Sequence, residues 1–198
     1  MNAIDQFRSN LKYVRSLVSI ERVLHTQTTP ALDTSDVLRA ALVMAVSALD
    51  QYCHEKVRQE MLNIKNGMRP TTDSYNRFTV TLRAVDRALS NPQSDEWLDD
   101  EIRSRHSFRA FQKSDKIKEA INLISGTNVW QLVASDLGTD SNTIRTQLDL
   151  IVDRRNQITH EADLDPGNPG VRWPILDADV QLSIDFIEGL VEAIDKRI

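Results

Sequence analysis

The segment that organises this chain is Val37-Leu-Arg-Ala-Ala-Leu-Val-Met-Ala-Val-Ser-Ala-Leu49, which is apolar on nearly every side. A helix with apolar side chains around its whole circumference is buried on several sides. Thr34 or Ser35 precedes the segment as a helix N-cap, and Gly67 is placed to end the helix soon after Ile64. We therefore expect one long helix at the centre of the protein.

Glycine and proline are scarce and clustered in this chain. There are six of each, and between the clusters apolar residues recur at helical spacing with little period-2 alternation. The sequence therefore predicts an all-α fold, a single compact bundle over residues 1–198. The expected helices cover about Ala3–Leu24, Thr34 or Ser35 to Ile64, Asp73 or Ser74 to Leu89, Ser94–Phe111, Ser114 or Asp115 to Ile124, Asn128–Leu137, Asn142–His160 and Asp177–Arg197.

Composition excludes several classes of protein. The 198 residues include 24 Lys and Arg against 29 Asp and Glu, a net charge of −5 that argues against coating nucleic acid through whole-molecule charge. A single cysteine and the lack of zinc-ligand spacing exclude a disulfide scaffold and a zinc module. No signal peptide and no long apolar run is recognisable. We expect a cytoplasmic protein without a membrane span, a metal or a cofactor.

The helix expected over Asn142–His160 carries an anomaly. At about 100° per residue, Arg155 lies at the centre of the apolar stripe that Ile144, Leu148, Ile151 and Ile158 form. A guanidinium on a core stripe is costly unless it is paired or opens into a cleft. Asn156 and His160 lie one turn apart on the adjoining stripe, so a cation, an amide and an imidazole converge at one helix end.

These side chains are suited to cleaving RNA without a metal. Histidine can take a proton from a ribose 2′-hydroxyl, arginine can neutralise a phosphate, and asparagine can orient either group. The alternative is structural: Arg155 pairs with a carboxylate of a neighbouring helix, and His160 interacts with the helix dipole. The spacing alone does not distinguish the two, because an Arg and a His at this distance arise by chance about once in such a chain.

Longer segments of the sequence help to choose between the RNA-cleaving and the structural interpretation of Arg155 and His160. The string Arg155-Asn156-Gln-Ile-Thr-His160 resembles the Arg-Asn-x-x-x-His signature of the HEPN superfamily (higher eukaryotes and prokaryotes nucleotide-binding). Leu148–Asp163 and the earlier Ser35–Glu55 resemble the branch called RiboL-PSP-HEPN. This resemblance implies an all-α up-and-down bundle and a metal-independent endoribonuclease that acts in phage defence or as a toxin.

The resemblance also implies roles for particular residues. Arg155 would hold the scissile phosphate, Asn156 would orient the cleft, and His160 would act as general base or acid, leaving a 2′,3′-cyclic phosphate. Two protomers would form a homodimer with one composite cleft, and an antitoxin or regulatory partner is a further expectation. Ala162 stands where one subset of the superfamily has a tyrosine, so a nucleotidyltransferase antitoxin that modifies this tyrosine is not supported.

Three further residues near the expected site, Arg154, Asp50 and His54, each have two interpretations. Arg154 would bind phosphate at the cleft rim, or pair with Asp149 or Asp153. Asp50 could pair with Arg155 across the bundle, and His54 could carry a proton or contact RNA. For Asp50 and His54, the alternative is an internal polar contact near the end of a buried helix.

Charge is distributed unevenly along the chain. Residues 101–118 hold six basic and two acidic side chains, and Arg105, Arg109 and Lys113 recur every fourth residue, as they would on one helix face. This line is either an RNA-backbone track or a solvated surface. Residues 161–195 hold nine acids and one arginine. This segment could cover the basic cleft, repel RNA that is not a substrate or bind a basic partner, or it could be a solvated amphipathic helix. Trp173 could stack on a base if its loop folds back.

The leading hypothesis is a homodimeric HEPN ribonuclease whose site consists of Arg155, Asn156 and His160. The first alternative is a non-catalytic HEPN module that binds RNA, a nucleotide or a protein partner. The second is a purely structural helical dimer.

Overall fold

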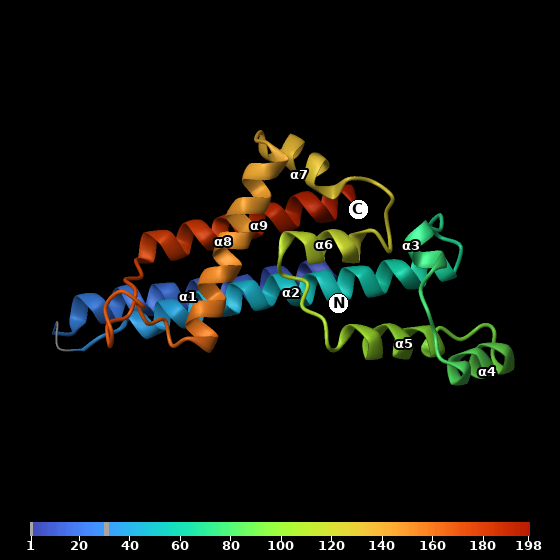
Figure 1. Ribbon diagram of the computed structural model, residues 1–198, viewed down its shortest axis with the longest axis horizontal. Coiled ribbons are helices and arrows are strands. Elements are labelled where there is room, and N and C mark those ends of the chain that lie inside the picture. The colour runs from blue at the N-terminus through green and yellow to red at the C-terminus, as the bar shows by residue number, and fades with distance from the viewer. Residues whose placement is uncertain (1, 30–31) are drawn as a thin grey trace.

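The protein folds as a bundle of helices (Figure 1). The computed structural model describes residues 2–29 and 32–198. Within these residues there are nine helices and no strand, which confirms the predicted all-α class. The helices are α1 (Ala3–Gln27), α2 (Ser35–Lys65), α3 (Asp73–Asn76), α4 (Leu82–Ser90), α5 (Glu96–His106), α6 (Ser114–Ile121), α7 (Val129–Leu137), α8 (Ser141–His160) and α9 (Asp177–Arg197).

The long helix α2 lies at the centre, as the apolar segment at its start predicts. It packs against α1, α9, α8, α5 and α6. The side chains of Ala45, Val46, Leu49 and Cys53 are completely buried along its length. Gly67, just beyond the helix, has a φ of 73°, the left-handed conformation that commonly ends a helix. Burial also raises the pKa of the Cys53 thiol, which keeps this cysteine protonated.

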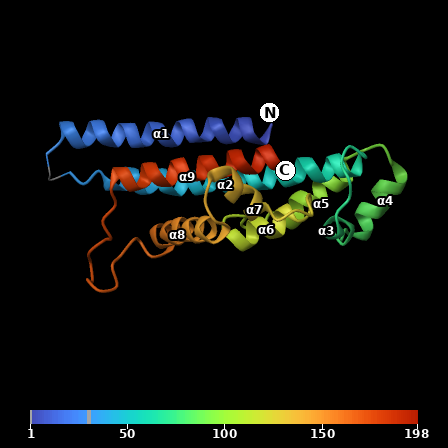
Figure 2. The same cartoon turned by 90° about the horizontal axis from the view of Figure 1, so that it is seen from above.

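Three helices run along the long axis of the molecule, and α8 crosses them. Figures 1 and 2 show α1, α2 and α9 side by side, with α1 antiparallel to the other two. In Figure 1, α8 passes steeply across α2, and its C-terminal end reaches the same side of the bundle as the chain that leads into α6. Among the described residues, no helix is both long and apolar enough to cross a lipid bilayer.

Two of the expected helices are wrong in extent. The helix expected to reach Leu89 is broken into α3 and α4, because the hydroxyls of Thr72 and Thr81 each accept a backbone N–H and so begin a separate helix. The helix expected to reach Phe111 ends at His106. The remaining predicted boundaries lie within about three residues of the observed ones, and α9 has the predicted bounds.

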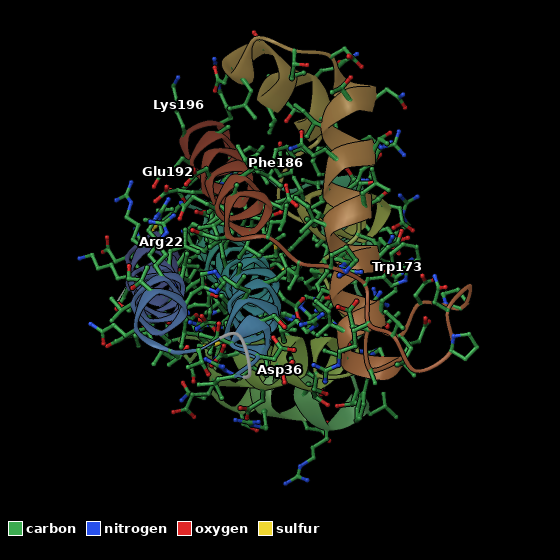
Figure 3. The ribbon with its side chains drawn as sticks, turned by 90° about the vertical axis from the view of Figure 1, so that its left-hand side faces the viewer. Arg22, Asp36, Trp173, Phe186, Glu192 and Lys196 are labelled. Carbon is green, nitrogen blue, oxygen red and sulfur yellow. The ribbon has the colours of Figure 1, made fainter. Side chains whose placement is uncertain are left out.

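Acidic side chains of α9 form ion pairs with arginines of α1. Arg8 pairs with Glu192, Arg15 with Asp185 and Glu188, and Arg22 with Asp177, at 2.6–2.8 Å. Figure 3 shows Arg22 and Glu192 on the side of the bundle away from α8 and Trp173. The arginines recur every seven residues on α1, which is the repeat that keeps one helix face toward a neighbour. The expectation that the acidic segment 161–195 covers the basic cleft is therefore wrong for these four acids.

Candidate functional site

Helix α8 positions the candidate residues at its C-terminal end. Asp140 caps its other end by accepting the backbone N–H groups of Asn142 and Thr143, both at 2.9 Å. Ile144, Leu148 and Val152 are buried along the face that packs on the bundle. Arg155 continues this face, but it is only half-buried, because it reaches the edge of the bundle.

The predicted catalytic residues share one open pocket of about 680 Å³. The pocket is bounded by three parts of the chain: residues 108–113 between α5 and α6, Lys116 and Glu119 of α6, and Val152, Arg155, Asn156 and His160 of α8. Arg155, Asn156 and His160 therefore face the same space. Arg155 and Asn156 are half-buried, and His160 is exposed.

Arg155 is held by an amide rather than by a carboxylate. One Nη of Arg155 donates to Oε1 of Gln112, and the Nε is buried without a hydrogen-bond partner. Within the described ranges, no carboxylate oxygen lies within 4.0 Å of its guanidinium. The structural alternative, in which Arg155 closes an ion pair with a neighbouring helix, is therefore not what the fold contains. A guanidinium without a carboxylate partner can bind an anionic ligand without first breaking an ion pair.

Asp50 does not pair with Arg155 directly, and that expectation is wrong. Its Oδ2 accepts from the Gln112 amide at 3.1 Å, and its Oδ1 accepts the backbone N–H of Phe111 at 2.6 Å. Asp50 therefore reaches Arg155 only through Gln112. No pattern in the sequence pointed to Gln112, because its role depends on α2 and α8 lying on either side of it.

His54 also holds the segment between α5 and α6. Its Nε2 lies 3.1 Å from the carbonyl oxygen of Arg109, and its ring stacks on Phe111 with centroids 4.4 Å apart. The side chain of His54 does not line the pocket. Asp50 and His54 thus make internal polar contacts that fix this segment. This agrees with the second interpretation of both residues, an internal contact near the end of a buried helix.

Arg154 takes neither of its expected partners. It forms an ion pair with Asp163 at 2.8 Å, and Asp163 is completely buried. Asp149 instead accepts the backbone N–H and the hydroxyl of Ser114 at the start of α6, and Asp153 pairs with Lys113 at 2.5 Å. Arg154 therefore points away from the pocket that Arg155 lines.

The basic residues do not form one line on a helix face. Because α5 ends at His106, Arg105 lies in the helix while Arg109 and Lys113 lie beyond it. Arg105 approaches Glu101 at 3.7 Å and stacks over Phe78, and it is not part of the pocket. Arg109 and Lys113 do line the pocket, so two of the three expected RNA contacts remain near the candidate site.

The pocket has an excess of positive charge. Arg109, Lys113, Lys116 and Arg155 line it, against Glu119 alone. Lys116 pairs with Glu119 at 2.8 Å, whereas Arg109 and Arg155 form no ion pair with any described residue. The net charge of the whole chain therefore conceals a local basic site suited to an anion.

Behind the pocket, His106 is buried among aromatic rings. Its ring packs edge-on against Phe111, with centroids 5.1 Å apart, and Phe78 lies on another side. Burial, with smaller contributions from the charges of His54 and Arg109, lowers the pKa of His106 to about 4. His106 is therefore neutral at pH 7 and acts as part of the core.

The fold and this site define an all-helical protein with an Arg-Asn-x-x-x-His segment at the end of α8, open to solvent. Residues 8–198 match the family described as RiboL-PSP-HEPN, and the chain belongs to that family. This confirms the resemblance found in the sequence. Neither a curated protein nor a solved structure gives a significant match to the chain.

Proposed function

We propose that this protein is a metal-independent endoribonuclease whose site comprises Arg155, Asn156 and His160. The observation that carries the proposal is that Arg155, without a carboxylate partner, shares an open basic pocket with the exposed His160. Membership of the RiboL-PSP-HEPN family supports it. The biological setting that we propose is phage defence, or a toxin controlled by an antitoxin or another regulatory partner.

The residues have distinct roles in this reaction. His160 removes the proton of the ribose 2′-hydroxyl, whose oxygen attacks the adjacent phosphorus. The bond from phosphorus to the 5′-oxygen breaks, and that oxygen receives a proton. Arg155 stabilises the extra negative charge on the phosphate, and Asn156 orients the reacting groups. The products are a 2′,3′-cyclic phosphate and a 5′-hydroxyl.

This reaction needs a base and an acid, and among the described residues the candidate pocket of one protomer contains a single histidine, His160. A second protomer placed with its α8 facing this one would supply the second imidazole. We therefore propose that the active species is a homodimer with a composite site. Light scattering gives the mass of the species, and a monomer that cleaves RNA at every concentration would contradict this part of the proposal.

The test is cleavage of single-stranded RNA in the presence of EDTA. The wild type is expected to cut, and the products are expected to carry a 2′,3′-cyclic phosphate, which mass spectrometry distinguishes from a linear phosphate. His160→Ala and Arg155→Ala should each lower the rate at least 100-fold, in line with the usual contribution of such groups. His25→Ala is the matched control, because His25 is 79% exposed on α1, away from the pocket.

Three results would count against the proposal. A wild type that binds RNA but never cuts it would favour a non-catalytic binding module. Cleavage that persists in His160→Ala would remove the assigned mechanism. Loss of cleavage in EDTA, restored by a divalent cation, would show that the reaction depends on a metal.

A further inference from the structure

Phe108 is the most exposed large apolar side chain described in this protein. It is 94% exposed, and it lines the pocket that contains Arg155 and His160. An aromatic ring in water forgoes the favourable free energy that burial of its apolar surface would provide. A ligand that enters this pocket can therefore gain binding free energy by covering the ring.

The backbone that carries Phe108 is held firmly on both sides. The N–H of Arg109 donates to the carbonyl oxygen of His106 at 2.9 Å, and the carbonyl of Arg109 lies 3.1 Å from His54 Nε2. Asp50 holds the N–H of Phe111 at 2.6 Å. These contacts anchor the loop to α2, so the ring extends from a fixed platform. A preorganised loop loses little backbone conformational entropy when a ligand binds to it.

The surroundings of Phe108 favour an anionic ligand over an apolar one. Arg109 follows it directly, and Arg155 lines the same pocket; neither forms an ion pair with a described residue. The other large apolar side chains of the pocket, Phe111 and Val152, are each only 1% exposed. Apart from Phe108, the pocket therefore offers little exposed apolar surface, and a ligand in it gains more from charge and from stacking on this ring than from wide apolar contact. An aromatic ring beside unpaired arginines is the usual arrangement for an unpaired base and its phosphates.

We infer that Phe108 stacks on an unpaired base of the single-stranded RNA whose phosphate Arg155 holds, and that this ring selects for an unpaired base at that position. This inference rests on the proposed function. In a duplex both faces of each base are covered by its neighbours, so a duplex offers no free face to Phe108. The ring thus determines specificity for an unpaired base. The positive charge of Arg109 attracts the RNA phosphate next to the stacked base.

The test measures RNA binding in the His160→Ala background, where the RNA stays intact. The probe is a single-stranded RNA oligonucleotide that contains 2-aminopurine, whose fluorescence reports stacking, and the comparison is the same strand in a duplex. Phe108→Ala should weaken binding of the single strand about 5- to 100-fold, as expected when one stacking contact is lost. Phe108→Trp should preserve both affinity and the stacking signal.

Tyr13→Ala is the matched control, because Tyr13 is an aromatic residue 64% exposed on α1, outside this pocket. It should leave the affinity unchanged. Equal weakening of single-stranded and duplex binding in Phe108→Ala, or no weakening of either, overturns the inference. If Phe108→Ala instead dissociates a dimer and RNA affinity falls only with dissociation, then Phe108 is a contact between protomers, and the inference also fails.

Binding and cleavage assays with His160 intact separate this inference from the proposed function. If the wild type neither binds nor cleaves any RNA, both are overturned. If the wild type cleaves single-stranded RNA and Phe108→Ala cleaves it with the same KM and kcat, only the role of Phe108 is overturned.

Discussion

Asp163, three residues after His160, is tied to Arg39 of α2, with Oδ2 and Nε 2.7 Å apart. Asp163 is completely buried and Arg39 is 6% exposed. Arg154 pairs with the same carboxylate, with its Nη1 2.8 Å from Oδ1 and its Nη2 2.9 Å from Oδ2. The backbone at Ala162 and Asp163 adopts φ values of 52° and 59°, a conformation that non-glycine residues adopt rarely. The ion pairs therefore hold a strained turn directly after the end of α8.

We predict that Asp163→Ala strongly destabilises the protein. Removing one partner of a buried ion pair leaves uncompensated charge in the interior, so the free energy of unfolding should fall by about 3–5 kcal/mol. Chemical denaturation followed by circular dichroism measures this. Glu161→Ala, an exposed change two residues earlier, is the control and should cost less than about 0.5 kcal/mol. A loss below about 1 kcal/mol in Asp163→Ala would show that the ion pairs contribute little.

Gln112→Glu should weaken RNA binding at the pocket more than Gln112→Ala does. The new carboxylate would lie against Arg155 and neutralise the charge that we assign to phosphate binding, whereas alanine only removes a hydrogen bond. We expect affinity for single-stranded RNA to fall at least tenfold in Gln112→Glu. Gln131→Glu makes the same change of charge at an exposed position on α7. Equal losses in the two glutamate variants would mean that only the total charge matters.

Stability should decrease in mild acid because of His106. Its pKa is about 4 in the folded protein and about 6.5 when exposed, so the unfolded chain binds more protons between these values. The contribution of the neutral ring is fully present above about pH 6.5 and is lost as the pH falls toward 4. Its full size is about 3 kcal/mol at most. In denaturation experiments, His106→Phe should make the free energy of unfolding less dependent on pH between about 4 and 6.5. An unchanged slope would contradict the lowered pKa of His106.

Leu49→Ala should test whether α2 is the central element of the core. Leu49 is completely buried, and deleting its side chain should cost about 2–5 kcal/mol through lost burial and the cavity left behind. Met44→Ala on the same helix is the control, because Met44 is 44% exposed. Similar unfolding free energies for the two variants would mean that this part of α2 is not packed as described.

Much of the architecture follows from local patterns in the chain. The apolar run Val37–Leu49 indicated the central helix, and the stripe on Asn142–His160 placed Arg155, Asn156 and His160 at one helix end. Predictions failed where a helix had to stop without a glycine or a proline. At His106 the chain leaves the helix, and the next residues are held by Asp50 and His54, which lie more than 50 positions earlier.

The sequence by itself determined the helical class, the central position of α2 and the common location of Arg155, Asn156 and His160, because these depend on spacing within single helices. Only the tertiary structure decided what each charge contacts. Adjacent arginines differ completely: Arg154 is bound to buried Asp163, whereas Arg155 is held by Gln112 and opens into the pocket. The reason is that successive residues on a helix point about 100° apart, so the packing of neighbouring elements, and not local sequence, selects their partners.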